Sequence, residues 1–548
     1  MQITGAQAIL SCLQEQGVNK VFGYPGGAIL PFYDALLQYP DIEHILTVHE
    51  QGAVHAADAY ARAGGGVGVC VATSGPGATN LVTGIANAFL DSIPMVIITG
   101  QVPTFMIGGD VFQEVDITGI TMPITKHTFL VKKPGQLVET IRLAFQIAQS
   151  DRPGPVLVDI PRNVQTAFVE YTVQQPNPIK KKHPDIESLK KAVQILSAAK
   201  RPLIMVGGGA VNANANELVK KLVEKTQIPV ASSLMGISAM DGHSEYYLGM
   251  SGLHGQEAAN RAIAMSDVML VIGCRFNDRV TGNKSLYAQD AQVIHLDIDY
   301  SELDKNINAT LGIVGELTDS LEYIIDNLTY EPSDIWWDCI RNWEMESKDK
   351  VHATQLYFML MSEMIKDEDV VVCTDVGQHQ MWTAQNVKVN RPRSFITSGG
   401  LGSMGFGIPA AMGAAFARPE AKVVCVSGDG GFKMTSQELY TIARYNLPVI
   451  SVVVNNSGLG MIRQLQTVMF DKSFSQCELP APFDFQKYAE VFGIKGYKTQ
   501  THAQFEEAFK QALKEGKPCI IEVVIDPKDM VIPMVQPGQA LNAFVDFD

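Results

Sequence analysis

The sequence predicts an α/β protein built from three doubly wound domains, each with a parallel sheet between layers of helices. Two observations predict this fold. Short, uninterrupted apolar runs alternate with segments of helical periodicity, and strands buried on both faces of a parallel sheet have this continuous apolar character. Two polar stretches also divide the 548 residues into three parts, each of ordinary domain size.

The expected strands lie in all three parts of the chain. They are residues 45–48, 67–72, 95–99, 156–160, 203–206, 268–272, 422–427 and 448–454. The first polar stretch, Gln174 to Ser188, contains several prolines, which neither a helix nor a central strand accommodates well. The second, Tyr330 to Lys350, holds three tryptophans among many charges and is predicted to be a helical connector. We therefore expect domains at residues 1–170, 189–328 and 355–548.

Composition excludes several classes of protein. With 46% apolar and 18% charged residues, the chain suits large, filled cores. A net charge of −15 argues against nucleic-acid binding, which needs basic patches. There is no run of 18 apolar residues, and residues 1–6 do not resemble a signal peptide, so we expect no membrane association and a cytoplasmic location. The eight cysteines are scattered without close pairs, which predicts buried thiols.

One βαβ unit near the C-terminus predicts a metal site. The run Lys422 to Ser427 leads into Gly428-Asp429-Gly430, and the next apolar run ends at Asn455-Asn456. A right-handed crossover brings the carboxyl ends of both strands to one edge of the sheet, so Asp429 and Asn456 should converge. A carboxylate and an amide oxygen suit Mg²⁺, which completes its shell with water, a backbone carbonyl and phosphates. Each cluster alone is also typical of an ordinary turn.

The separation of Gly-Asp-Gly from the asparagine resembles the fingerprint of thiamine diphosphate enzymes. Further motifs resemble the catalytic subunits of acetohydroxyacid synthases (acetolactate synthases). These motifs are residues 21–28, 48–53, 72–80, 112–116, 374–382 and 402–407. The resemblance covers nearly the whole chain. It implies two cofactor domains flanking a central FAD-type domain, and an enzyme that decarboxylates pyruvate and joins the two-carbon unit to pyruvate or 2-oxobutanoate in valine, leucine and isoleucine biosynthesis.

The resemblance implies catalytic roles for particular residues. Glu50, at the end of one apolar run and the start of a helical segment, would activate the aminopyrimidine ring of the cofactor. An acidic residue favoured by a helix dipole is the alternative. Met404 would support the bent cofactor, although a buried methionine usually fills a core. Phe112, Gln113 and Lys126 resemble residues near the substrate, and a solvated surface lysine is an equal alternative for Lys126.

The resemblance also implies the cofactor contacts. Mg²⁺ would be bound by Asp429, Asn456 and the backbone carbonyl of Gly458. The other residues expected at thiamine diphosphate are Gly27, Val376, Gly377, Gln378, His379, Gly428, Gly430, Gly431, Leu459, Gly460 and Met461.

The middle part contains Gly207-Gly208-Gly209 after an apolar run, without the Gly-x-Gly-x-x-Gly spacing of a dinucleotide fingerprint. Only the resemblance implies that FAD binds here, with no net redox step. The residues at matching positions are Arg152, Gly207, Gly208, His254, Gly273, Arg275, Arg279, Asp297, Ile298, Gly315 and Glu316.

The chain departs from the family pattern at several positions. Many members carry Trp, which helps to select 2-oxobutanoate, where this chain has Leu465. Since one methylene in an apolar pocket is worth about 1–3 kcal/mol, we hypothesise a weak preference for 2-oxobutanoate over pyruvate. Gly109 and Asn277 stand where Thr and Asp are common, and Lys433 places a charge beside the metal loop.

The resemblance implies a homodimer or tetramer, because the family binds its cofactor between the first domain of one subunit and the third domain of another. A small regulatory subunit is a possible further partner. The alternatives are a pyruvate oxidase-like flavoenzyme, a flavin-free catabolic acetolactate synthase, and a catalytically silent structural subunit. Retention of Glu50, Asp429 and Asn456 argues against the silent subunit.

Overall fold

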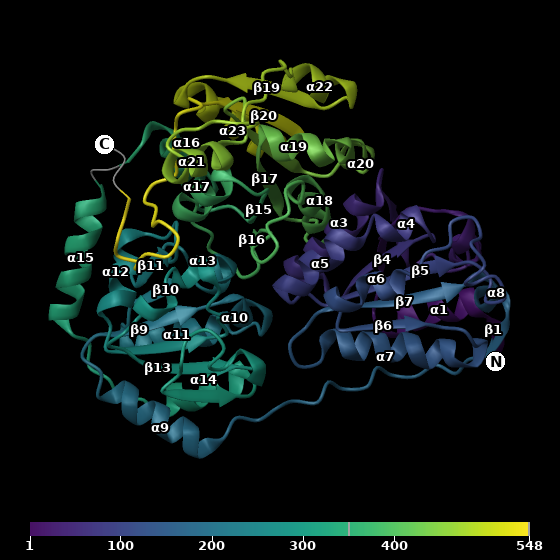
Figure 1. Cartoon of the computed structure of the whole chain (residues 1–548), viewed down its shortest axis with the longest axis horizontal. Helices are drawn as coiled ribbons and strands as arrows, with labels where there is room; N and C mark the ends of the chain where they lie inside the picture. Colours follow the sequence, from purple (N-terminus) through teal and green to yellow (C-terminus); the bar gives the residue numbers. More distant parts are fainter. Residues whose placement is uncertain (349–350, 546–548) are drawn as a thin grey trace.

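A computed structural model describes residues 1–348 and 351–545. It shows three lobes, each built on a six-stranded sheet with helices on its faces (Figure 1). The strand pairs within these three sheets are parallel. The predicted fold class, three doubly wound α/β domains, is thereby confirmed.

The first lobe holds the N-terminal third of the chain. Its strands are β1 (Gln2–Thr4), β2 (Lys20–Gly23), β3 (Glu43–Leu46), β4 (Gly68–Ala72), β5 (Met95–Gln101), β6 (His127–Leu130), β7 (Pro155–Pro161) and β8 (Phe168–Glu170). Its helices are α1 (Gly5–Glu15), α2 (Leu30–Leu36), α3 (Glu50–Tyr60), α4 (Pro76–Thr79), α5 (Val82–Asp91), α6 (Ile117–Thr121), α7 (Leu137–Gln149) and α8 (Arg162–Thr166). The sheet order is β3-β2-β4-β5-β7-β6, and β1 and β8 form a separate antiparallel pair. Strand β3 is thus an edge strand.

The central lobe follows residues 171–185, which form neither helix nor strand and cross between the two lobes (Figure 1). Its strands are β9 (Pro202–Val206), β10 (Val230–Ser232), β11 (Tyr247–Met250), β12 (Val268–Ile272), β13 (Gln292–Asp297) and β14 (Leu311–Val314). Its helices are α9 (Ile186–Ser197), α10 (Gly208–Asn212), α11 (Asn216–Thr226), α12 (Glu257–Met265), α13 (Asp278–Thr281) and α14 (Leu317–Asn327). The sheet order is β11-β10-β9-β12-β13-β14.

Helix α15 (Asp334–Lys348) leads to the third lobe, which confirms the predicted helical connector. Residues 349 and 350, at the end of the predicted connector, lie outside the described residues. The strands of this lobe are β15 (Val370–Thr374), β16 (Phe395–Ile396), β17 (Lys422–Gly428), β18 (Val449–Asn455), β19 (Lys495–Thr499) and β20 (Cys519–Val524). Its helices are α16 (Ala353–Ile365), α17 (Gln378–Asn386), α18 (Gly407–Ala417), α19 (Asp429–Thr435), α20 (Leu439–Arg444), α21 (Gly460–Met469), α22 (Phe485–Val491) and α23 (His502–Glu515). The sheet order is β16-β15-β17-β18-β20-β19.

Helices α3 and α18 join the first and third lobes. Both consist mostly of small buried residues, and their side chains belong to one continuous apolar core. A Cβ atom at Gly413 of α18 would collide with the carbonyl oxygen of Ala56 of α3. Glycine there lets the two backbones approach closely.

Two further expectations concern membranes and cysteines. A helix needs about 20 apolar residues to span a bilayer, and among the residues that the structure describes no helix meets that requirement. The eight cysteines are free thiols, and all are buried except Cys339 on α15.

Candidate active site

The metal loop lies where β17 and β18 end side by side. These strands pair in parallel, with Gly428 opposite Val454, so Asp429 and Asn456 follow neighbouring strand ends at the same edge of the sheet. Helix α19 begins directly at Asp429. The first turn of this helix therefore carries Asp429.

Asp429 is suited to bind a cation. Its side chain is buried, and neither carboxylate oxygen has a hydrogen-bond partner among the described residues. Burial raises the pKa of this carboxyl group, and a buried carboxylate normally requires a counter-charge. The ammonium of Lys433 lies 3.6 Å from Oδ2. Beside it, Asn456 Oδ1 accepts a hydrogen bond from the backbone N–H of Gly458 at 3.2 Å.

The start of α17 lies against this loop. Asn456 Nδ2 donates to Gln378 Oε1 at 3.2 Å, and a Cβ atom at Gly428 would lie 2.9 Å from His379 Nδ1. Burial lowers the pKa of His379 to about 3, so the ring is neutral, and its buried Nε2 has no hydrogen-bond partner among the described residues. An unpaired nitrogen and glycines that admit close approach fit a phosphate oxygen.

Asp375, to which the sequence had assigned no role, holds the loop that carries Met404. Its buried carboxylate accepts hydrogen bonds from the backbone N–H groups of Gly405 (2.9 Å) and Gly407 (3.0 Å). A Cβ atom at Gly430 would lie 3.8 Å from Met404 Cε. The structure thus places Met404 beside the metal loop.

Glu50 lies in the first lobe at the first turn of α3. Its Oε2 accepts a hydrogen bond from Asn80 Nδ2 at 3.0 Å, and a Cβ atom at Gly77 would lie 3.3 Å from its Oε1. The backbone of Gln113 packs against Gly75, where a Cβ atom would be 3.0 Å from Gln113 Cα. The structure therefore brings Gln113 to the glycine loop next to Glu50.

Phe112 and Lys126 are the other two residues expected near the substrate. The side chain of Phe112 is 86% exposed. Lys126 precedes β6, at the amino edge of the sheet, whereas Glu50 follows the carboxyl end of β3. The ammonium of Lys126 donates to the carbonyl oxygens of Ile147 and Ser150 at the end of α7, and burial lowers its pKa to about 8. Within one chain, Lys126 stabilises α7.

The two clusters of site residues lie apart within the chain. Figure 1 shows α4, beside Glu50, and α17, beside the metal loop, on opposite sides of α18.

A groove of about 1150 Å³ lies where the three lobes meet. Nine of the eleven residues expected at FAD line it, and the other two, Gly207 and Gly315, adjoin the lining residues Gly208 and Glu316. Burial lowers the pKa of the lining residue His254 to about 4, and its buried Nε2 has no hydrogen-bond partner in the part of the chain that the structure describes. The predicted residues thus belong to one site large enough for a dinucleotide.

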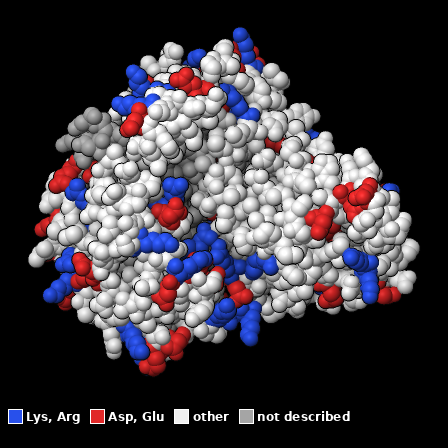
Figure 2. All heavy atoms as spheres, in the orientation of Figure 1, with Lys and Arg blue, Asp and Glu red and all other residues white. Residues whose placement is uncertain are grey.

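The groove is rich in positive charge. Figure 2 shows Lys and Arg gathered over the hollow between the lobes. The cationic residues that line the groove are Arg152, Lys180, Lys181, Lys182, Arg275, Arg279 and Lys305. From the third lobe, the groove is lined by Val376, Gly377, Met461 and Leu465. It therefore adjoins the start of α17, which lies against the metal loop.

Asn277 departs from the family pattern without loss of local structure. Its side-chain oxygen accepts a hydrogen bond from the backbone N–H of Val280 at 3.1 Å, capping α13. Asparagine and aspartate serve equally well as N-caps.

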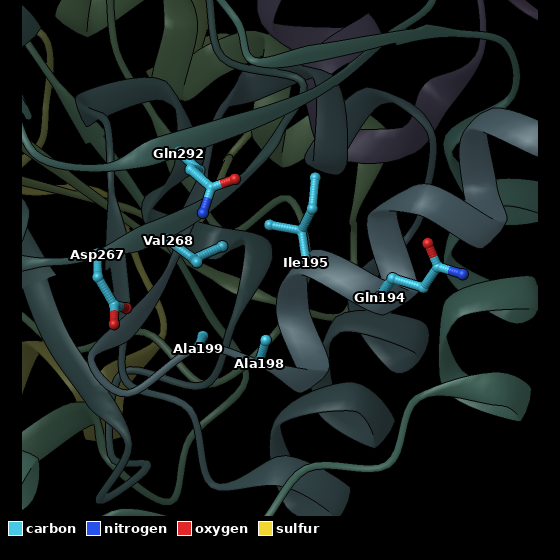
Figure 3. A pocket seen from close by; sticks show the side chains of 7 residues that line it. All are labelled: Gln194, Ile195, Ala198, Ala199, Asp267, Val268 and Gln292. Atoms are coloured by element: carbon cyan, nitrogen blue, oxygen red, sulfur yellow. The ribbon is translucent and has the colours of Figure 1, made fainter.

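A smaller cavity of about 320 Å³ lies on the central lobe between α9 and the start of β12 (Figure 3). Its acidic side chain, Asp267, accepts hydrogen bonds from the backbone N–H groups of Lys200 (2.8 Å) and Arg201 (2.9 Å). Asp267 therefore fixes the turn between α9 and β9.

Three family models match the chain: the thiamine pyrophosphate enzyme N-terminal TPP binding domain at residues 3–120, the central domain at 189–324, and the C-terminal TPP binding domain at 375–523. The probable acetolactate synthase large subunit of Methanocaldococcus jannaschii is 44% identical over 99% of this chain and 95% of its own length. The acetolactate synthase isozyme 2 large subunit of Escherichia coli K12 is 44% identical over 99% and 100%. The acetolactate synthase large subunit of Haemophilus influenzae is 41% identical over 99% and 98%. The chain therefore belongs to the acetolactate synthase large-subunit family of thiamine pyrophosphate enzymes.

Proposed function

We propose that this chain is the catalytic subunit of an acetolactate synthase in branched-chain amino acid biosynthesis. It decarboxylates pyruvate and joins the remaining two-carbon unit to a second 2-oxoacid, pyruvate or 2-oxobutanoate. The observation that carries this proposal is the buried Asp429 carboxylate beside the buried Nε2 of His379. Neither group has a hydrogen-bond partner among residues 1–348 and 351–545. A metal-bound diphosphate satisfies both groups.

Mg²⁺ would be held by Asp429, Asn456 and the carbonyl of Gly458, and the diphosphate by Gln378 and His379. When bound, thiamine diphosphate supplies the carbon nucleophile and the electron sink that decarboxylation requires. Glu50 would hold a proton at its carboxyl group for the aminopyrimidine nitrogen of the cofactor, and its hydrogen bond from Asn80 (3.0 Å) holds the carboxyl group in place.

FAD would occupy the large groove, where the cations meet its diphosphate and His254 offers a neutral ring. The groove reaches Leu465, so it adjoins the expected substrate pocket.

The active enzyme would be a homodimer at least, with each site formed by Glu50 of one copy and Asp429 of the other. The separation of the two clusters across α18 supports this assembly (Figure 1). The alternative assembly is a tetramer. Because the relatives are named large subunits, we also propose a small regulatory subunit as partner.

The test is a colorimetric acetolactate assay with pyruvate, thiamine diphosphate, Mg²⁺ and FAD, each omitted in turn. Omission of any cofactor should abolish activity, and Glu50→Gln should lower it at least 100-fold. Full activity of Glu50→Gln would refute the assignment of Glu50. Activity without flavin would indicate the flavin-free catabolic enzyme, and bleaching of the flavin by pyruvate would indicate an oxidase.

A further inference from the structure

A buried carboxylate of the third lobe holds the backbone just before Glu50. Glu438, which is fully buried, accepts hydrogen bonds from the backbone N–H groups of Val48 (3.1 Å) and His49 (3.0 Å) and from the hydroxyl of Thr441 (2.8 Å). Val48 and His49 lie between the end of β3 and the first residue of α3, which is Glu50. The contact therefore fixes the turn that presents Glu50.

The local chemistry favours this contact. The first N–H groups of a helix have no partner within the helix, and a negative charge near them is stabilising. A Cβ atom at Gly52 would collide with Glu438 Oε1, so glycine is required for the carboxylate to approach. Three donors suit a carboxylate, which only accepts hydrogen bonds when ionised.

The part of the third lobe that carries Glu438 and Thr441 also contacts β3. The hydroxyl of Tyr445 accepts a hydrogen bond from the backbone N–H of Leu46 (3.3 Å) and donates to the carbonyl of His44 (3.4 Å). Because β3 is an edge strand, these backbone groups would otherwise lack a strand partner. Glu438, Thr441 and Tyr445 recur at helical spacing and form one supporting face.

We propose that Glu438 is a positioning residue for Glu50. Helix α19 and a 3₁₀ turn (Ser436–Glu438) run without a loop from Asp429 to Glu438. If the active sites are shared between two copies, as proposed above, each third lobe serves two sites. Its Asp429 binds metal in one site, and its Glu438 positions the Glu50 that its own chain contributes to the other.

The first test compares Glu438→Gln with the exposed control Glu420→Gln. Glutamine keeps the size but offers one acceptor atom to three donors. We expect kcat to fall about 10- to 100-fold, as for a small misplacement of a catalytic group, while KM for pyruvate and Mg²⁺ affinity measured by calorimetry stay within about twofold. An unchanged kcat would overturn the proposal. Should Glu438→Gln fail to fold, Tyr445→Phe should lower kcat in the same selective way, and an unchanged kcat there would overturn it.

Hybrid dimers, purified through a different affinity tag on each chain, show which active site Glu438 of a given chain affects. A Glu50→Gln chain paired with an Asp429→Asn chain has one intact site if sites are shared, and about half of the wild-type activity is expected. No activity would mean that each chain holds a complete site, which contradicts the proposed assembly; the Glu438→Gln homodimer would still decide the role of Glu438.

Glu438→Gln is then added to either chain of the hybrid. On the Asp429→Asn chain, which supplies the working Glu50, it should lower activity about 10- to 100-fold. On the Glu50→Gln chain, which supplies only the working Asp429, activity should be retained. Equal losses in both placements, or no loss in either, would overturn the assignment.

Discussion

Removal of the Asp91 carboxylate should both destabilise the protein and weaken flavin binding. Asp91, at the end of α5, accepts hydrogen bonds from Arg62 (2.9 Å) and from the backbone N–H groups of Gly399 (3.1 Å) and Gly400 (2.7 Å). Arg62 and Asp91 are both buried. Gly399 and Gly400 line the groove, so this carboxylate joins the first lobe to the wall of the proposed flavin site.

The cost of Asp91→Ala follows from the donors left behind. Each buried donor without a partner costs about 1–3 kcal/mol, and breaking a buried ion pair costs about 3–5 kcal/mol. Arg62 keeps a second partner, Asp58, which places the expected loss near the lower limit, at about 3 kcal/mol.

The assays are urea unfolding of the apoprotein and fluorescence titration with FAD. We expect a lower midpoint of the first cooperative transition and weaker FAD binding. The control is Glu187→Ala, which removes an exposed pair with Lys190 and should leave both measurements unchanged. Wild-type midpoint and FAD affinity in Asp91→Ala would refute the reasoning.

Three further predictions concern specificity, metal binding and pH. Leu465→Trp should raise the preference for 2-oxobutanoate over pyruvate in competition assays, and an unchanged product ratio would contradict this. Lys433→Met should tighten Mg²⁺ binding about fivefold in calorimetry, because a cation 3.6 Å from Asp429 opposes the metal by about 1 kcal/mol; weaker binding would contradict this. Burial raises the pKa of Asp159 to about 7, so the folded state retains a proton that the unfolded chain loses near pH 4. Stability should therefore fall as pH rises from about 4 to 7, and Asp159→Asn, compared by urea unfolding across that range, should remove this slope.

The bounds of a strand could be predicted where they coincide with the ends of an apolar run. Strand β12 occupies the predicted residues 268–272, because the whole run is buried in the centre of a sheet. Strand β3 was expected to continue to Val48, but it ends at Leu46. The backbone N–H of Val48 donates to Glu438, which lies 390 positions away. The sequence around Val48 therefore cannot predict this partner.

In the candidate site, too, some features follow from the sequence pattern and others depend on residues far away in the chain. A topological rule sufficed to bring Asp429 and Asn456 together, because parallel strand order determines which ends meet. Asp375, Asp91 and Glu438 were missed as supporting residues, since each binds backbone N–H groups, which every residue type except proline offers.

The packing of α3 against α18 bears on why two copies would be needed. A Cβ atom at Gly413 would collide with the backbone of Ala56, so these helices meet at a distance that leaves no room for a cofactor between them. The first and third lobes of one chain therefore pack directly against each other along these two helices. In the loop between β5 and α6 that carries Gln113, the side chains of Phe105 and Phe112 are 82% and 86% exposed. Exposed apolar residues of this size are costly in water and often mark an interface, and the third lobe of a second copy would cover them while bringing its Asp429 to Glu50.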